Sequence, residues 1–559
     1  MTTMQHHPAR AGRIRVGAAL AVLALLAAAC GSSKPKTTSP TTAPGTGGGP
    51  TTTTTLVPKQ GGDLTMGVEA EIDGFDPTQN RFDITGHLYA TTIYDPLTQI
   101  GKDGKAHPYL AESVTPDSTY KTWTITVRPN VTFTNGDPLT GAVVAADLTA
   151  QTKSLLTGSA LNDVDHVAAG PGPLSAQVFT KRAWTVFPLY LSGQLGYMFD
   201  PKSTDTVKKP IGTGPFMLKE WVPGDHMTAV RNPNYWQKGL PYLNSVTFKP
   251  ILDNTSRENS LLSGTVDMIH TDNPPTIVDL RKKSNITLLD TSKFQARTEM
   301  DFYMINTIAP PFNDLTLRKA LAEATNQQSL NTTFGAGILH LSNGPYTHGT
   351  PWYVDSGYPA YNPTDAKALV DAWKAKNGGK APSFTLDVTN TALSLQTAQF
   401  VQDMWGQVGF NLNIKQIEQS QYILTAIQGN YQVIGWRQFG EVDPDQDFTW
   451  WSSTDAAPIG KFALNFARNN DSKLDQDLIT GRTSTVESDR IAAYQDISKQ
   501  MGQDIPYIWV DESLWSLAFN KKVEGVQEWM MPDGSPGADN LTVGGLGGGT
   551  IFEHVWLNS

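Results

Sequence analysis

The stretch FVQDMWGQVGFNLNI at residues 400–414 joins a helical pattern to a strand pattern. Its first half places apolar side chains at the spacing of one helix face. Gly409 stands where a helix commonly ends in a left-handed residue, and Leu412 and Ile414 then alternate with polar residues as in a half-buried strand. We therefore expect a helix followed by a strand, the repeating unit of an α/β lobe. The helical face comprises Phe400, Val401, Met404 and Val408.

Other parts of the chain repeat this mixture of helix and strand signals without a fixed period, which argues against a solenoid or a propeller. Apolar and threonine residues alternate over 122–127, and the alternation resumes at Val131 and Phe133 after the turn at 128–130. This pattern predicts two half-buried strands joined by a turn. Further on, Asp314 or Thr316 is positioned to cap a helix whose apolar face is Leu317, Leu321 and Ala324.

The first residues have the order of an export signal. Arginines precede an apolar run over 16–29, which is too short for a membrane span of about 20 residues. Leu26-Ala27-Ala28-Ala29-Cys30 resembles a bacterial lipobox, so we expect cleavage after residue 29 and acylation of Cys30. The alternative is ordinary secretion with an incidental cysteine. Residues 31–59 are rich in Thr, Pro and Gly and predict a disordered tether.

Size and charge narrow the class of protein. At 559 residues the chain is long enough for two or three lobes. A net charge of -10 and the absence of a basic stripe argue against a nucleic-acid partner. Cys30 is the single cysteine, so the chain forms no internal disulfide. Enzyme signatures such as Gly-x-Ser-x-Gly, a Walker loop or a dinucleotide fingerprint are missing, and we expect no enzyme and no cofactor.

A series of short phrases in one order gives the chain a family resemblance. Their glycines and prolines set backbone shape, and Gly212 and Gly214 in particular indicate a close approach of a strand. The series resembles bacterial extracellular solute-binding protein family 5, the periplasmic peptide- and nickel-binding proteins of ABC importers. The phrases are Val131-Thr132-Phe133-Thr134-Asn135-Gly136, Ile211-Gly212-Thr213-Gly214-Pro215-Phe216, Arg231-Asn232-Pro233-Asn234-Tyr235-Trp236, Leu261-Leu262-Ser263-Gly264-Thr265-Val266-Asp267, Pro310-Pro311-Phe312-Asn313-Asp314 and Tyr361-Asn362-Pro363.

The resemblance implies an α/β, periplasmic-binding-protein-like fold with two lobes joined by a hinge and an extra subdomain inserted in the first lobe. After a signal peptide at 1–30, we expect lobe I at 60–309 with the insertion near 105–205, lobe II at 310–508, and a return to lobe I at 509–559. The crossover segments are expected near 303–306 and 508–510. Closure of such lobes over a ligand is a hinge motion.

The resemblance also implies a function. We expect a lipid-anchored, extracytoplasmic monomer on the outer face of the cytoplasmic membrane that captures peptide-like ligands and delivers them to ABC permease subunits with a separate ATPase. One alternative is a binding protein for a non-peptide solute, such as a sugar, a metal chelate or another amphipathic molecule. A second is a surface receptor or a hydrolase on the same scaffold.

The stretch from Ile434 to Phe448 resembles the family segment in which an aspartate binds the α-ammonium of a peptide. Phe439 stands at that position and accepts no hydrogen bond. A buried ammonium needs a carboxylate partner, and we expect it from Glu441 or, failing that, Asp443. Trp436 is expected to form a wall for an apolar or cationic ligand group, the alternative being a core residue.

Four other ligand-binding candidates carry weaker signals. Phe82, Asp83 and His87 lie in an early segment that faces the ligand in relatives, and Trp352 follows a loop rich in Gly and Pro. Core packing explains Trp352 equally well. No histidine pair has the sequence spacing of a zinc or nickel motif, so we expect no metal site.

Overall fold

A computed structural model describes residues 56–80, 82–155, 157–291, 299–438, 440, 442–541 and 551–558. The expected signal peptide, Cys30, most of the tether, Phe439 and Glu441 lie outside these residues. Within the described part of the chain, no helix has both the length and the apolar run that crossing a bilayer requires.

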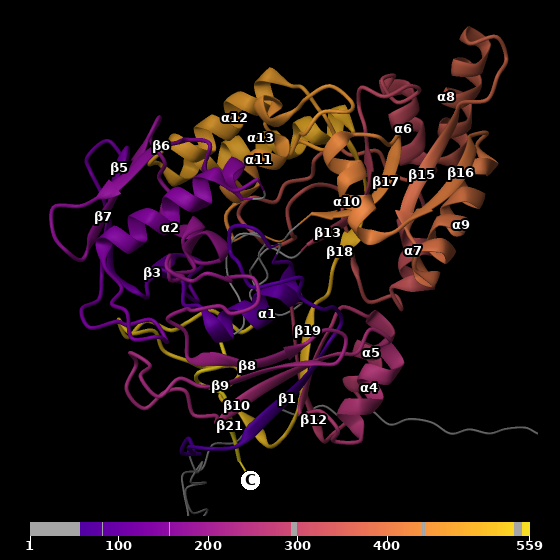
Figure 1. The fold of residues 1–559 in the computed structure, drawn as a ribbon. Helices are drawn as coiled ribbons and strands as arrows, with labels where there is room; N and C mark the ends of the chain where they lie inside the picture. Colours follow the sequence, from indigo (N-terminus) through magenta and orange to yellow (C-terminus); the bar gives the residue numbers. More distant parts are fainter. Residues whose placement is uncertain are drawn as a thin grey trace, which may run out of the picture. The chain divides into compact units, whose positions relative to one another are not determined.

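A mixed seven-stranded sheet gathers strands from both ends of the described chain, in the order β12-β19-β11-β1-β10-β9-β8. The first strand, β1, runs parallel to β10 and β11, while β19 is antiparallel to β11 and β12. Figure 1 shows α4 (Asn254–Leu262) and α5 (Pro274–Leu280) beside this sheet. The strands are β1 (Asp63–Val68), β8 (Phe216–Val222), β9 (His226–Arg231), β10 (Ser245–Pro250), β11 (Met268–Thr271), β12 (Ile286–Asp290) and β19 (Ser516–Asn520).

A six-stranded sheet in the order β14-β18-β13-β17-β15-β16 forms the second α/β layer. Here β15 is parallel to β16 and β17, whereas β13 is antiparallel to β17 and β18. The strands are β13 (Met300–Ile305), β14 (His340–Leu341), β15 (Ser383–Thr389), β16 (Asn411–Ile417), β17 (Val433–Gln438) and β18 (Tyr507–Glu512). The helices over this part of the chain are α6 (Leu315–Ala324), α7 (Gln327–Phe334), α8 (Pro363–Lys376), α9 (Ala392–Gln407), α10 (Gln419–Gln428), α11 (Phe448–Trp451), α12 (Ser472–Thr483) and α13 (Glu487–Asp504).

A third, antiparallel sheet in the order β4-β5-β7-β6 has its own apolar core. The helix α2 (Gly141–Lys153) packs on it, and the core includes Trp123, Leu148 and Trp184. Its strands are β4 (Ala111–Pro116), β5 (Thr122–Val127), β6 (Val164–Ala169) and β7 (Ser175–Thr180). The short α1 (Ile84–Ile93), β2 (Thr98–Ile100), β3 (Ala106–Pro108) and α3 (Phe187–Tyr190) complete the part that precedes β8.

The helix-to-strand prediction for 400–414 is confirmed. The helix α9 ends at Gln407, Gly409 follows with a positive φ of 105°, and β16 begins at Asn411. The capping prediction is also confirmed, because the Asp314 side chain accepts a hydrogen bond from the Thr316 amide at 2.9 Å and α6 begins at the next residue.

The prediction of two strands around 128–130 is wrong in its second half. Residues 122–127 form β5, but Thr132 makes only an isolated bridge to Pro138. The backbone of Phe133 and Gly136 is instead engaged in the tight turn at 133–137, through Phe133 N–H to Asp137 and Gly136 N–H to Phe133. Val131 and Phe133 are both buried. The alternating sequence pattern therefore predicted the burial of these side chains correctly, but it predicted strand pairing that the backbone does not form.

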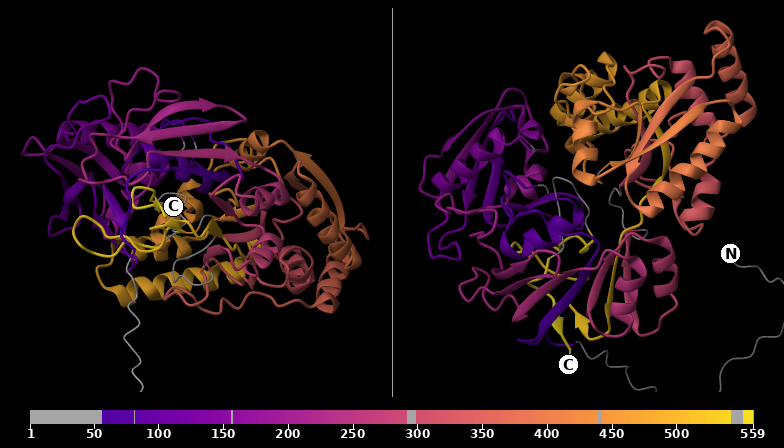
Figure 2. Two further views of the ribbon diagram at one scale, coloured as in Figure 1. Left: turned by 90° about the horizontal axis from the view of Figure 1, so that it is seen from below. Right: turned by 45° about the vertical axis from the view of Figure 1, so that its right-hand side comes forward.

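The chain crosses between the two large sheets at places other than those expected. Residues 303–305 lie within β13 and 508–510 lie within β18. The passage from one sheet to the other falls between Asp290 and Met300, and the return falls between Glu512 and Ser516. The right-hand view of Figure 2 shows the returning yellow segment beside magenta strands, in agreement with the pairing of β19 with β11 and β12. The division of the chain into lobes stays a prediction.

Candidate functional site

One end of the six-stranded sheet brings the expected site residues close to the crossovers. At this end Met300 is in register with Gln438 on one side and with Glu512 on the other, and Glu512 is in register with His340. The loop that follows β17 therefore leaves the sheet beside both passages to the seven-stranded sheet. Ligands in open α/β sheets bind beyond the carboxyl ends of parallel strands, and β15 and β17 end on this side.

Trp436 forms an aromatic wall near this end. Its ring stacks on Tyr422 with a centroid distance of 5.6 Å and an interplanar angle of 17°, and it meets Phe466 edge-on at 5.4 Å. The Trp436 side chain is half-buried, so packing fixes its orientation while part of the indole remains accessible. An indole held in this way suits an apolar or cationic group of a ligand.

Arg437 links the two large sheets and was not among the predicted residues. Its Nη1 donates to Asp272 Oδ2 at 2.9 Å, and Asp272 directly follows β11 of the seven-stranded sheet. Its Nε lies 3.2 Å from Glu299 Oε2, and its guanidinium lies over the Trp515 ring at 5.2 Å. The partners Glu299 and Trp515 both belong to the crossover segments. The sequence offered a weak signal, namely an arginine directly after the aromatic wall.

Carboxylates outnumber the arginine around this position. Burial raises the pKa of Glu299 to about 7 even though Arg437 opposes the shift. Burial also raises the pKa of Asp301 and holds that of Asp511 well above its usual value. Ionisation of these buried carboxyl groups is therefore energetically unfavourable unless a cation lies nearby.

The facing end of the seven-stranded sheet carries a second polar group. His270, in β11, stacks on Trp515 at 4.6 Å, and its Nδ1 lies 2.9 Å from Glu69 Oε1 just after β1. Burial raises the pKa of Glu69, but His270, Thr85 and Arg257 outweigh this effect and lower it to about 2. Glu69 is thus a largely buried, ionised carboxylate at the carboxyl end of a parallel strand, with 16% of its side chain exposed.

Asp443 is already paired in the structure. Its carboxylate accepts two hydrogen bonds from Arg490 Nη2, at 2.6 and 2.8 Å, and it caps the 3-10 helix η4 (Pro444–Asp447) by accepting from the Asp445 amide at 3.0 Å. These contacts give Asp443 a structural role. Glu441, the other carboxylate expected to bind an ammonium, lies outside the described residues.

The other predicted residues pack inside the protein. Phe82 is buried against Tyr197, and His87 Nδ1 lies 2.8 Å from the Tyr197 hydroxyl. Asp83 caps α1 by accepting from the Gly86 amide at 2.8 Å. Trp352 meets Tyr494 edge-on at 5.4 Å and lies under the Arg490 guanidinium. The structure thus groups Trp352 with Asp443 through Arg490 and places Trp352 in the same apolar cluster as Trp436, whereas Phe82 packs with His87 and Tyr197 in a different cluster.

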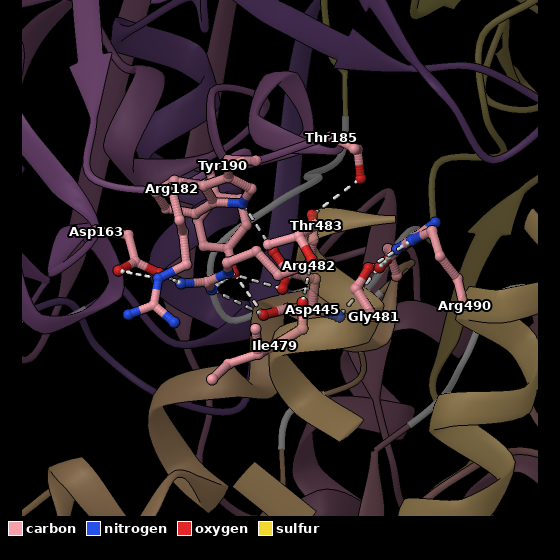
Figure 3. A network of polar contacts seen from close by, with 12 residues as sticks. Asp163, Arg182, Thr185, Tyr190, Asp445, Ile479, Gly481, Arg482, Thr483 and Arg490 are labelled. Atoms are coloured by element: carbon pink, nitrogen blue, oxygen red, sulfur yellow. Dashed lines mark hydrogen bonds and ion pairs between the residues drawn. The ribbon is translucent and has the colours of Figure 1, made fainter. Parts of the chain in front are cut away.

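A buried ion-pair network joins α12 and η4 to the four-stranded subdomain (Figure 3). Arg482 pairs with Asp445 Oδ1 at 2.9 Å and with Asp163 Oδ2 at 2.8 Å, and its Nη2 donates to the Tyr190 hydroxyl at 3.0 Å. Trp184 Nε1 donates to Asp445 Oδ2 at 2.8 Å. Because these groups are almost completely buried, each charge depends on its partner across the junction.

A potential metal-ligating group was missed by the sequence analysis. His340, His348 and Glu512 place one ligand atom each within 4.8 Å of the other two. The two histidines are eight positions apart, and strand pairing with β18 supplies the third residue. Sequence spacing therefore gave no signal for it.

Comparisons with known proteins agree with this architecture. The family model for bacterial extracellular solute-binding proteins, family 5, matches residues 105–458. A glutathione-binding protein of Salmonella paratyphi A is 25% identical over 495 residues, covering 84% of this chain and 92% of the relative. The nickel-binding periplasmic protein of Escherichia coli is 25% identical over 451 residues, covering 76% and 85%.

Solved structures share the fold at low identity. The periplasmic binding protein DppA of Helicobacter pylori, in complex with the peptide STSA, has a TM-score of 0.76 at 19% identity, covering 90% of this chain and 99% of that one. The oligopeptide-binding protein AppA of Bacillus subtilis, in complex with a nonapeptide, has a TM-score of 0.75 at 21% identity, covering 90% and 100%. The expected two-lobed, periplasmic-binding-protein-like α/β fold is therefore confirmed. With a family model that matches most of its length and relatives that it covers almost end to end, this chain belongs to the bacterial extracellular solute-binding proteins, family 5.

Proposed function

We propose that this protein is the substrate-binding lipoprotein of an ABC importer and that it captures peptide-like solutes between two closing lobes. The observation that carries the proposal is the Arg437–Asp272 ion pair at 2.9 Å, which joins the two large sheets beside the aromatic wall of Trp436. A bound solute that adds contacts to both sheets at this place favours the closed arrangement. Delivery to permease subunits then follows from the role of the family.

The charge of the site favours a ligand with an ammonium group. Glu299, Asp301 and Asp511 surround one arginine, and their raised pKa values mean that an added cation would stabilise their ionised forms. Glu441 supplies the carboxylate that pairs with the α-ammonium of the peptide, in the loop that leaves the sheet after β17. Similar proteins described as binding glutathione, the peptide STSA and a nonapeptide are in keeping with this class.

Cys30 anchors the protein in this proposal. Acylation of its thiol holds the chain on the outer face of the cytoplasmic membrane, and the tether at 31–59 gives the folded body its reach. Replacing Cys30 by Ala is expected to move the protein from the membrane fraction into the soluble extracytoplasmic fraction. An unchanged distribution would contradict the anchor without affecting the solute-binding role.

Calorimetry with matched peptides tests the ligand class. We expect a free-amine tripeptide to bind the unaltered chain and its N-acetylated form to bind about 100-fold more weakly, since a buried carboxylate loses its charged partner. Glu441→Gln is expected to weaken the free-amine peptide by a similar factor, while Glu487→Gln, at an exposed position of α13, leaves it unchanged. Equal affinity of Glu441→Gln and the unaltered chain would remove Glu441 from the site. Binding of nickel–histidine in preference to every peptide would replace the peptide proposal.

A further inference from the structure

Two histidines and a glutamate from separate segments meet at the edge of the six-stranded sheet. His340, in β14, lies directly opposite Glu512 in β18. His348 lies in the following loop, where its backbone N–H donates to Glu512 Oε1 at 3.0 Å and its Nδ1 lies 2.7 Å from the same oxygen. Since one ligand atom of each residue lies within 4.8 Å of the other two, three donors converge on one point.

The cluster combines a buried carboxylate with two exposed imidazoles, as is expected of a metal site that an ion can reach from solution. The Glu512 side chain is only 7% exposed, and strand pairing and the His348 amide fix its position. Both imidazoles are exposed, so an ion from solution can reach their ring nitrogens. A fixed carboxylate and two movable imidazoles need only small side-chain rotations to bring the ligand atoms to the separation of about 3.3 Å that tetrahedral coordination at 2.0–2.1 Å requires.

Other histidines of the described chain also contact carboxylates but lack this arrangement. His226, for example, lies 2.8 Å from Asp225 and 3.5 Å from Glu220. That pairing has one imidazole, and its three ligand atoms do not form a group as compact as the one around Glu512. A histidine beside acidic residues is thus common on this surface, whereas the combination of two imidazoles and a buried carboxylate is the distinguishing feature.

We propose that His340, His348 and Glu512 bind a first-row divalent transition-metal ion such as Zn²⁺ or Ni²⁺. Imidazole and carboxylate donors suit these ions, and three protein ligands leave at least one coordination position for water or a small ligand. On binding, the ion takes the place of the hydrogen between His348 Nδ1 and Glu512 Oε1, and that hydrogen leaves to solvent as a proton. The ion then connects β14, the loop at 342–348 and the last residue of β18.

The proposed metal site lies beside the segment by which the chain returns to the seven-stranded sheet, and it is separate from the aromatic wall of Trp436. Glu512 is the last residue of β18 before the return to the seven-stranded sheet. An ion held by β14 and β18 lies two to three strand spacings, roughly 10–14 Å, from the β17 strand that carries Trp436. The proposal is therefore independent of which solute the protein carries.

Metal titration of the full chain tests the site. The protein is prepared without an affinity tag and with the expected signal peptide left in place. It carries His6→Ala and His7→Ala, because two adjacent histidines bind such ions themselves. We expect one Zn²⁺ per chain in calorimetry with a dissociation constant in the micromolar range or below, and visible absorption on addition of Co²⁺. His340→Ala, His348→Ala and Glu512→Gln are each expected to weaken Zn²⁺ binding at least tenfold.

The matched control is His226→Ala, which removes a histidine with two neighbouring carboxylates and is expected to leave Zn²⁺ binding unchanged. Copper(II) electron paramagnetic resonance on the chain with only the two N-terminal changes avoids any folding defect of the site variants. It is expected to show two imidazole nitrogens in the Cu²⁺ spectrum. Absence of saturable binding, retention of full affinity by the His340→Ala/His348→Ala variant, or an equal loss in His226→Ala would overturn the proposal.

Discussion

Single charged side chains act at junctions where both members of each pair are buried. Arg482 connects Asp445 of η4 with Asp163 of the four-stranded subdomain, and Arg490 holds Asp443. The Asp-Pro-Asp sequence at 443–445 was predicted in part as ligand-binding, because sequence shows a carboxylate but not its partner. The partners Arg482 and Arg490 lie more than thirty positions away, and only the folded chain shows that they neutralise these aspartates.

Replacing Arg482 by an uncharged residue should lower the stability of the folded protein. Arg482→Met leaves Asp445 and Asp163 without their buried cation, and we expect the free energy of unfolding to fall by about 3–5 kcal/mol. Arg182→Met is the control, because Arg182 also pairs with Asp163, at 2.9 Å, but is 39% exposed. Its expected loss is below about 1 kcal/mol. Urea unfolding followed by tryptophan fluorescence measures both, and similar losses in the two variants would contradict the assignment of a buried network to Arg482.

Glu299 should make stability depend on pH. Burial raises the pKa of Glu299 from its usual value of 4.5 to about 7 in the folded chain, so the folded state holds the proton more tightly than the unfolded state. This contribution to stability is complete below about pH 4.5 and is lost as the pH rises through 7, by at most about 3 kcal/mol. Glu299→Gln is expected to flatten this part of the profile in urea unfolding between pH 5 and 8. A variant with the same slope as the unaltered chain would show that Glu299 titrates normally.

At the scale of elements, sequence patterns correctly predicted those helices, strands and caps that depend on interactions between residues close in sequence. The α9–β16 unit and the Asp314 cap depend on residues close in sequence, and the structure has both. The edge strand β14 has only two residues and forms by pairing with β18, which is distant in sequence. No local sequence pattern therefore predicts it. The close approach predicted at Gly212 and Gly214 is present, but its partner is the carboxyl end of α1 at Ile93 instead of a strand.

A pair of glycine substitutions tests that approach. A Cβ on Gly214 would lie within 3.0 Å of the Ile93 carbonyl group, and we expect Gly214→Ala to lower the free energy of unfolding by about 2 kcal/mol or more. Gly406, exposed inside α9, has no atom within 4 Å of such a Cβ. Gly406→Ala should raise stability by up to about 1 kcal/mol. Thermal melts of the two variants that shift in the same direction would argue against the close contact.

At the scale of the whole molecule, the sequence was sufficient for the fold class and the family, because six short phrases set backbone shape in a fixed order. It was insufficient for the links between sheets. Arg437 with Asp272 and Arg482 with Asp163 join segments separated by more than a hundred residues, and neither pair follows from a motif. The crossovers were misplaced by several residues because β13 and β18 extend to the end of the sheet.

The central claim is that the protein holds a small solute between its lobes and releases it chemically unchanged. Native mass spectrometry of the protein, purified from its own host without denaturation, measures this directly. We predict one noncovalent adduct of small-molecule mass per chain, which acid releases intact and which rebinds to the emptied protein with its mass unaltered. Rebinding that yields cleavage products, or a protein that neither carries nor takes up any solute from its host's extract, would contradict the account.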